Sequence, residues 1–257
     1  MSDDLITSTL NGHVLHIRMN RVAKKNALDY AMYQGLADAF AAAAENSQAR
    51  VVLITGDDKT FCSGNDISDF LNGKPMDDTH PLPRFMRLLA NFPKPDVAGV
   101  CGPAIGIGVT MLLHCDLIYA GESARFQFPF VNIGICPEFG STLLLPAMLG
   151  HPRAAELLLL GEMFSAEKAR EAGIVNAVLA DADTLAHAAA QAEKLAAKAP
   201  NALRVSKALM KRWPQELLQQ VIATENQTFV PMLKMPESLE ALNAFMEKRK
   251  PDFSRFE

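Results

Sequence analysis

The chain has 257 residues, of which 49% are hydrophobic and 21% are charged, and its formal net charge at pH 7 is -4. This balance is typical of a globular protein that buries a sizeable core. The negative net charge argues against a nucleic-acid partner, so an anionic ligand would need cations close to its site. We also expect no membrane partner, because no apolar run reaches the length of a membrane-spanning helix.

The four cysteines lie in apolar or turn sequence and lack the C-x-x-C spacing of a zinc site or a disulfide framework: Cys62, Cys101, Cys115 and Cys136. We therefore expect no metal and a reducing compartment. We expect no targeting signal at either end. Residues 1–4 are acidic and lack the basic and apolar regions of a signal peptide, and residues 255–257 do not match the S-K-L signal for peroxisomes. These features favour a cytoplasmic protein.

The first half of the chain predicts an α/β fold with parallel strands. Residues 5–9 and 13–19 alternate around Asn11-Gly12, which predicts a β-hairpin. Residues 27–46 carry an apolar face at helical spacing, and residues 51–55 form a buried strand. A strand, a helix and a strand are then expected at residues 97–101, 109–114 and 117–120.

The second half predicts mainly helices. They are expected at residues 153–160, at 166–171 with Ser165 as N-cap and Gly173 at the end, and at 185–199. Residues 73–83 are polar and proline-rich, which predicts a mobile loop. We place a core with the candidate site in residues 1–195 and a C-terminal helical region in residues 196–257.

Two turns are candidates for binding a developing negative charge. The glycine-rich turn at residues 102–108 runs into the expected helix, so backbone N–H groups near Ile107 point out of a helix N-terminus. The turn at residues 61–66 follows a strand and offers a second N–H group. Together they predict an oxyanion hole. The alternative is that the glycines only permit tight turning, whereas G-x-G-x-x-G and P-loop patterns do not fit.

A lone glutamate, Glu138, follows in an otherwise neutral stretch and is a candidate general base. The alternative is that it favours a helix N-terminus ahead of Ser141 and Thr142. Asp66 is expected to be a helix cap, and Asp116 and His114 are expected to be structural.

Seven pieces of sequence carry a resemblance to a known family: Asn26-Ala27-Leu28, Ser63-Gly64-Asn65-Asp66-Ile67, Gly102-Pro103-Ala104-Ile105-Gly106, Cys115-Asp116-Leu117-Ile118-Tyr119-Ala120, Phe126, the run from Ala169 to Val175, and Phe245-Met246-Glu247-Lys248-Arg249-Lys250. In this order and spacing they resemble the crotonase (enoyl-CoA hydratase/isomerase) superfamily over nearly the whole chain. The resemblance implies a spiral core of ββα units, an acyl-CoA substrate and no other cofactor. It also implies a homotrimer or a dimer of trimers, with residues 196–257 as the trimerisation region.

Within the superfamily the chain most resembles the peroxisomal-type Δ3,Δ2-enoyl-CoA isomerases, through Phe128-Pro129-Phe130, Ser141-Thr142 after Pro137-Glu138, and the run from Pro200 to Lys207. The two carboxylates of family hydratases match Thr110 and Phe130, which cannot exchange a proton in that role. We therefore expect an isomerase that uses Glu138 as its single base.

The resemblance implies an oxyanion hole made by the backbone amides of Asn65 and Ile107. A neutral wall of Phe128, Phe130, Ile133, Ile135 and Phe139 is expected to raise the pKa of Glu138 by desolvation. Relatives usually have a small residue after the glutamate, so Phe139 is expected to narrow the pocket. The implied substrate-binding residues are Lys24, Asn26, Ala27, Ser63, Gly64, Ile67, Gly106, Thr110, Phe130 and Lys248.

Other functions remain open at this point. The oxyanion hole is common to several crotonase reactions, so hydration, thioester hydrolysis or decarboxylation of an acyl-CoA are alternatives. A further alternative is a non-catalytic acyl-CoA-binding protein. Retention of Glu138 among neutral residues favours an enzyme.

Overall fold

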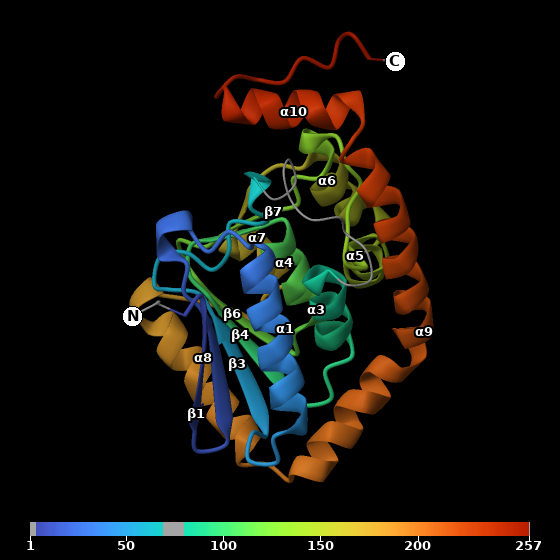
Figure 1. Ribbon diagram of the computed structural model, residues 1–257. Helices are drawn as coiled ribbons and strands as arrows, with labels where there is room; N and C mark the ends of the chain where they lie inside the picture. Colours follow the sequence, from blue (N-terminus) through green and yellow to red (C-terminus); the bar gives the residue numbers. More distant parts are fainter. Residues whose placement is uncertain (1–3, 69–79, 257) are drawn as a thin grey trace.

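The computed structural model describes residues 4–68 and 80–256 and has a large central sheet flanked by helices (Figure 1). The sheet has the strand order β1-β2-β3-β4-β6-β9. Its strands are β1 (Ile6–Asn11), β2 (Val14–Met19), β3 (Val51–Thr55), β4 (Asp96–Val100), β6 (Leu117–Gly121) and β9 (Ala177–Leu179). β1 and β2 form the predicted antiparallel hairpin, and every other pair in this sheet is parallel.

Both faces of the large sheet are covered at β3 and β4, which explains why these two strands are buried along their whole length. Val51 and Leu53 of β3 pack with Ala188 and Ala192 of α8 (Asp181–Ala196). The alternate residues of β3 join the other core, which contains α1 (Tyr30–Glu45) and α3 (Pro81–Ala90). Because successive side chains of a strand point to opposite faces, one strand serves two helical layers.

A second sheet has the order β5-β7-β8, formed by β5 (Pro103–Ile105), β7 (Arg125–Gln127) and β8 (Phe164–Ser165). Cys62 joins its edge through a parallel bridge to Ala104. Successive stretches of chain therefore place one strand in the large sheet and the next in the small one. This arrangement confirms the α/β class and the ββα spiral core.

Some predicted elements have different limits in the structure. The first helix begins at Tyr30 rather than at residue 27, because Asp29 caps it and accepts a hydrogen bond from Met32 N. Lys25 and Asn26 have positive φ angles, which a helix excludes. The glycine-rich turn contains β5, and the helix after it divides into α4 (Ile107–Thr110) and the 3₁₀ helix η2 (Met111–His114).

The prediction of a loop at residues 73–83 is wrong at its C-terminal end, because Pro81 begins α3 and His80 caps this helix. Residues 73–79 lie outside the described residues. The alanine-rich helix α8 begins at Asp181 and ends at Ala196 rather than spanning 185–199, with Asp181 and Asp183 in its first turn. Ser165 caps α7 (Ala166–Glu171) as predicted.

The remaining described helices are η1 (Val22–Lys24), η3 (Val131–Ile133), α5 (Ser141–Leu149), α6 (His151–Leu160), α9 (Pro200–Met232) and α10 (Pro236–Met246). The long α9 runs along the outside of the molecule and leads to α10 at one end (Figure 1). The predicted boundary between residues 195 and 196 falls at the C-terminal end of α8. Within residues 4–68 and 80–256, no helix is both long and apolar enough to cross a bilayer.

A buried ion-pair cluster fastens α9 to the large sheet. The Nζ atom of Lys207 lies 2.6 Å from Asp96 Oδ1 and 2.7 Å from Asp116 Oδ2, and it donates to the carbonyl oxygen of Lys94. Lys207 is 3% exposed. Asp116 is therefore structural, as expected. Removing the cation would leave two carboxylates unpaired in a nearly dry environment.

We expect Lys207→Met to lower the free energy of unfolding by about 3–5 kcal/mol, the range for breaking a buried ion pair from one side. Urea denaturation of the variant and of the wild type measures this loss. Lys198→Met is the matched control, because Lys198 is exposed just before α9. A loss below about 1 kcal/mol for Lys207→Met would contradict the anchoring role.

Candidate active site

The two predicted oxyanion turns are joined by backbone hydrogen bonds. Cys62 N donates to the carbonyl oxygen of Pro103 at 3.0 Å, and Ile105 N donates to that of Cys62 at 2.9 Å. Gly106 N donates to the carbonyl oxygen of Gln127, which ties the second turn to β7. The structure therefore brings together two turns that lie about forty residues apart in sequence.

Each turn presents a backbone amide with no carbonyl partner among the described residues. Leu28 and Asn65 form a parallel bridge in which Leu28 N donates to Gly64 and Asp66 N donates to Leu28, so Asn65 N is not used by the bridge. Ile107 N begins α4, where the first amides have no intrahelical acceptor. The amides of Asn65 and Ile107 are therefore available as donors, and their role as an oxyanion hole stays a prediction.

Glycine is required where the turns approach each other. A Cβ atom on Gly108 would lie 2.6 Å from the carbonyl oxygen of Cys62, so only glycine permits this contact. Gly106 has φ 56° and ψ -120°, a conformation that residues with a side chain avoid. These glycines therefore set the distance between the turns and the direction of the Ile107 amide.

Residues 24–28 run beside the first turn. Ser63 N donates to the carbonyl oxygen of Lys25 at 3.1 Å. Asn26 is fully buried, and its side-chain amide donates to the carbonyl oxygens of Thr60 and Phe61 while its oxygen accepts from Arg21 N. The Asn26 side chain is therefore committed to holding the turn, and contact of its backbone with a substrate stays a prediction. Ala27 is half-buried in the same segment.

A cavity of about 360 Å³ lies over the two amides. Seven predicted site residues line it: Ser63, Gly64, Asn65, Ile67, Gly106, Ile107 and Phe130. The rest of the described lining is Ile105, Gln127, Pro129, Asn132, Ile133, Ile135, Phe229, Ala241, Phe245, Arg249 and Pro251. The cavity is mostly apolar with a few polar groups near the amides, which is typical of a small-molecule site.

Glu138 lies beside the helix that carries the Ile107 amide. Its Oε1 accepts a hydrogen bond from Thr110 Oγ1 at 2.9 Å, and the residue is 2% exposed. Burial raises the pKa of Glu138 to about 8, although the Thr110 hydrogen bond lowers it and the nearby Glu225 adds to the rise. The predicted upward shift is confirmed, with desolvation as its main cause.

The carboxylate of Glu138 does not cap α5. Only its backbone carbonyl contacts this helix, where it accepts from Ser141 N and Oγ. The amides of Gly140 and Thr142 at the helix start are taken by Glu225 instead. The alternative reading of Glu138 as a helix N-terminal acid is therefore wrong, and its carboxylate remains available for chemistry.

Phe139 does not narrow the cavity, contrary to expectation. It has φ 58°, is fully buried, and stacks on His114 with ring centroids 3.9 Å apart. His114 Nε2 bonds to the carbonyl oxygen of Phe139, and burial lowers the pKa of His114 to about 3. The left-handed backbone turns the Phe139 side chain into the core, which confirms His114 as structural.

The cavity lining does not include every predicted site residue. Lys24 and Lys248 are exposed, Thr110 and Glu138 are buried, and none of the four is among the described lining residues. Phe128 stacks on Phe164 in the core rather than facing the cavity. Contacts of these residues with a substrate stay predictions.

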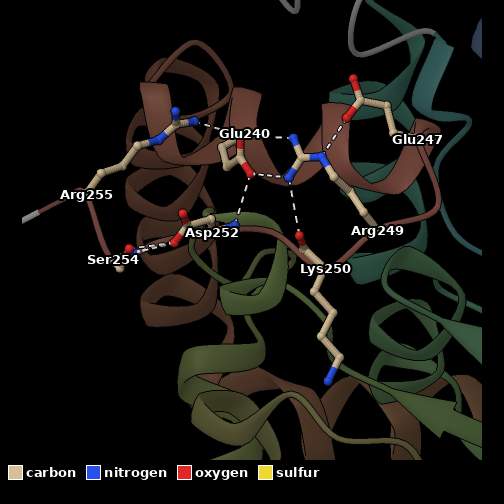
Figure 2. A network of polar contacts seen from close by, with 7 residues as sticks. All are labelled: Glu240, Glu247, Arg249, Lys250, Asp252, Ser254 and Arg255. Carbon is tan, nitrogen blue, oxygen red and sulfur yellow. Dashed lines mark hydrogen bonds and ion pairs between the residues drawn. The ribbon is translucent and has the colours of Figure 1, made fainter.

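Arg249 lines the cavity, but it was not predicted from the sequence, which led to its neighbour Lys248 instead. Its guanidinium is held by Glu240 and Glu247 and bonds to the carbonyl oxygen of Lys250 (Figure 2). Arg249 lowers the pKa of Glu240 to about 2. The signal for Arg249 was the basic run after α10, but sequence cannot tell which cation borders the cavity when Lys248 adopts φ 56°.

Two amide side chains of the lining were also missed. Gln127 Nε2 and Asn132 Nδ2 both donate to the carbonyl oxygen of Gly161, at 2.8 and 2.7 Å. This shared acceptor fixes their orientation. Within the described residues, no three histidine, cysteine or acidic side chains gather so as to hold a metal ion.

Comparison with known proteins places this geometry in a family. A family model described as "Enoyl-CoA hydratase/isomerase" matches residues 9–255. The 2,3-dehydroadipyl-CoA hydratase of Escherichia coli (strain K12) is 35% identical over 243 residues, which cover 93% of this chain and 94% of the relative. The peroxisomal enoyl-CoA delta isomerase 3 of Mus musculus is 32% identical over 255 residues, covering 96% and 80%.

A solved structure of Pseudomonas aeruginosa OdaA is similar over the whole fold. It superposes with a TM-score of 0.93 and 50% sequence identity, and the match covers 95% of this chain and 99% of that one. Hydratase and isomerase relatives are thus similar to this chain to a comparable degree. The residues of the site must separate the two reactions.

The raised pKa of Glu138 predicts a pH dependence of stability. Between the ordinary value of 4.5 and about 8, the unfolded chain ionises this group while the folded protein keeps it protonated. The wild type therefore loses stability through this window, and Glu138→Gln lacks this loss. We expect the variant to gain stability relative to the wild type between pH 5 and pH 9, as measured by urea denaturation. A constant difference would show that Glu138 ionises normally.

Proposed function

Because the chain belongs to the enoyl-CoA hydratase/isomerase family, we propose that it shifts the double bond of a 3-enoyl-CoA to the 2-position. One observation carries this proposal. Glu138 is a buried carboxylate of raised pKa beside the helix of the Ile107 amide, while Thr110 and Phe130 occupy the positions that match the hydratase acids. One base suffices for an isomerisation and does not suffice for hydration by two acids.

The thioester carbonyl oxygen accepts hydrogen bonds from the amides of Asn65 and Ile107. The Glu138 carboxylate takes a proton from C2, and the electron pair of the broken C–H bond moves into the carbonyl to form an enolate. Glu138 then returns the proton to C4 as the double bond moves between C2 and C3. A pKa of about 8 suits both steps, because the group both accepts and releases a proton near neutral pH.

The apolar lining protects the enolate from water, and the cations around the cavity serve the coenzyme A part of the substrate. Phe130, Ile133 and Ile135 line the side that receives the acyl chain. Among the described lining residues, Arg249 is the one cation. Lys24 and Lys248 are exposed cations that can approach the nucleotide phosphates. The backbone of residues 26–27 beside the first turn is the proposed path of the pantetheine.

We expect the purified wild type to isomerise a 3-enoyl-CoA at least ~10²-fold faster than it hydrates crotonyl-CoA, and Glu138→Gln to lower isomerisation by at least ~10²-fold with acyl-CoA affinity nearly unchanged. Product analysis by chromatography separates isomerisation from hydration, hydrolysis and decarboxylation. Glu162→Gln is the matched control at an exposed glutamate.

Preferred hydration of crotonyl-CoA would overturn the isomerase assignment and leave the family unchanged. Turnover of Glu138→Gln near that of the wild type would remove Glu138 from the mechanism. Binding of acyl-CoA with no product of any kind would favour the non-catalytic alternative.

The outer face of α9 supports the proposal of a homotrimer or a dimer of trimers with residues 196–257 at its contacts. Val205, Leu209, Trp213 and Leu217 recur every fourth residue and are exposed, Trp213 to 84%. An exposed apolar stripe of this length marks a protein interface. The four free cysteines support a reducing compartment, for which we propose the cytoplasm.

We expect Leu209→Glu together with Trp213→Glu to convert the oligomer to monomers that keep the wild-type circular dichroism spectrum, because two charges cannot be buried in an apolar contact. Sedimentation velocity measures the change. Glu216→Gln on the same helix is the control, and a trimer that persists in the double variant would place the interface elsewhere.

A further inference from the structure

A second buried glutamate supports the segment that carries Glu138. Glu225 of α9 is 6% exposed, and its Oε2 accepts from Gly140 N at 2.5 Å. Its Oε1 accepts from Thr142 N at 3.1 Å and from Thr142 Oγ1 at 2.5 Å. Both oxygens therefore accept from backbone N–H groups at the start of α5. Burial raises the pKa of Glu225, and these hydrogen bonds oppose the rise because they stabilise the ionised form.

The supported segment has an uncommon backbone. Phe139 has φ 58° and Gly140 has φ 74°, so two consecutive residues after Glu138 are left-handed. Such a conformation persists for a phenylalanine only where its surroundings hold it. His114 holds the carbonyl of Phe139 from one side, and Glu225 holds the next amide from the other. The N-cap residue Gly140 has no side chain, so Glu225 performs the capping from another helix.

We propose that Glu225 is the positioning residue of Glu138: through Gly140 and Thr142 it fixes the backbone that aims the catalytic carboxylate. This inference rests on the proposed function, in which Glu138 is the base. Glu225 does not contact the reacting atoms. It is absent from the lining of the substrate cavity and borders a separate cavity of about 400 Å³ with Cys136, Pro137 and Thr142.

Glu225 also acts on Glu138 through its charge. After burial, its negative charge is the second influence that raises the pKa of Glu138. The other groups facing the pair are neutral: Thr110 and Thr142 are hydroxyls, and burial raises the pKa values of the Cys62 and Cys136 thiols. A variant without the Glu225 charge therefore has a more acidic Glu138. Positioning and charge predict two separate effects of one substitution.

The test compares Glu225→Gln, Glu225→Asp and the control Glu216→Gln, which changes an exposed glutamate of the same helix. We expect Glu225→Gln to lower kcat for 3-enoyl-CoA isomerisation at least ~10-fold with KM within about twofold, since small misplacements of a base are costly. The acid limb of its kcat/KM profile moves to lower pH. Glu225→Asp keeps the negative charge, so we expect the acid limb of its kcat/KM profile to stay at the pH of the wild type. Its kcat falls nevertheless, because the aspartate side chain is one methylene shorter and its carboxylate does not reach the same amides.

A second measurement does not depend on turnover. In protein labelled with ¹³C at the glutamate carboxyl carbons, the NMR signal that is absent from Glu138→Gln belongs to Glu138. We expect this signal to titrate at lower pH in Glu225→Gln than in the wild type. Thr142→Ala removes one of the three contacts and gives a smaller loss of kcat, which keeps the test valid if Glu225→Gln does not fold.

The outcomes separate this inference from the proposed function. If the wild type does not isomerise 3-enoyl-CoA, the proposed function fails and the ¹³C titration alone decides on Glu225. Unchanged kcat and an unchanged Glu138 titration in folded Glu225→Gln would overturn the inference while isomerisation by the wild type continues. A loss of kcat shared equally by Glu216→Gln would also overturn it.

Discussion

The site depends on a close contact between two backbones. The turns that carry Asn65 and Ile107 meet through the Cys62–Ala104 bridge, and Gly108 permits the approach because it has no Cβ atom to strike Cys62. Hydrogen bonds between main chains fix this contact, so the two free amides stay in place without help from side chains. A rigid pair of donors is what stabilises a developing oxyanion, since no reorganisation is needed as charge appears.

The second constraint on the site is the burial of Glu138, which sets the pKa of its carboxyl group. Glu138 is surrounded by apolar residues and keeps one hydrogen bond, from Thr110, so its protonated and ionised forms are of similar free energy near neutral pH. The sequence resemblance matches Thr110 to one of the two carboxylates of the family hydratases. Here a hydroxyl donates to the base instead, which orients the carboxylate and moderates its pKa. This arrangement supports the proposed isomerisation, in which a single proton moves between two carbon atoms.

Sequence predicted the parts of the fold that follow from local patterns. The Asn11-Gly12 hairpin, the strand at residues 51–55 and the Ser165 cap are correct, because turn chemistry and apolar runs are local. The two turns that carry Asn65 and Ile107 were also predicted, because glycine-rich turns after strands are visible in sequence. The burial of the Phe139 side chain in the core was not predicted, because its φ angle depends on His114 and Glu225, which are distant in the chain. Arg249 was missed for the same reason, since the direction of a helix end depends on tertiary contacts.

The helix α9 connects these distant parts. Lys207 and Glu225 lie about five turns apart at 3.6 residues per turn, and therefore on the same face. At one end Lys207 joins α9 to β4 and to the start of β6 through Asp96 and Asp116, and at the other Glu225 holds the start of α5. Leu218, Ile222 and Phe229 are buried on that inner face, while Val205, Leu209 and Trp213 are exposed on another. One helix can thus carry both the support of the base and a face for assembly, so contacts made by a neighbouring subunit along the outer face would stiffen the segment that positions Glu138.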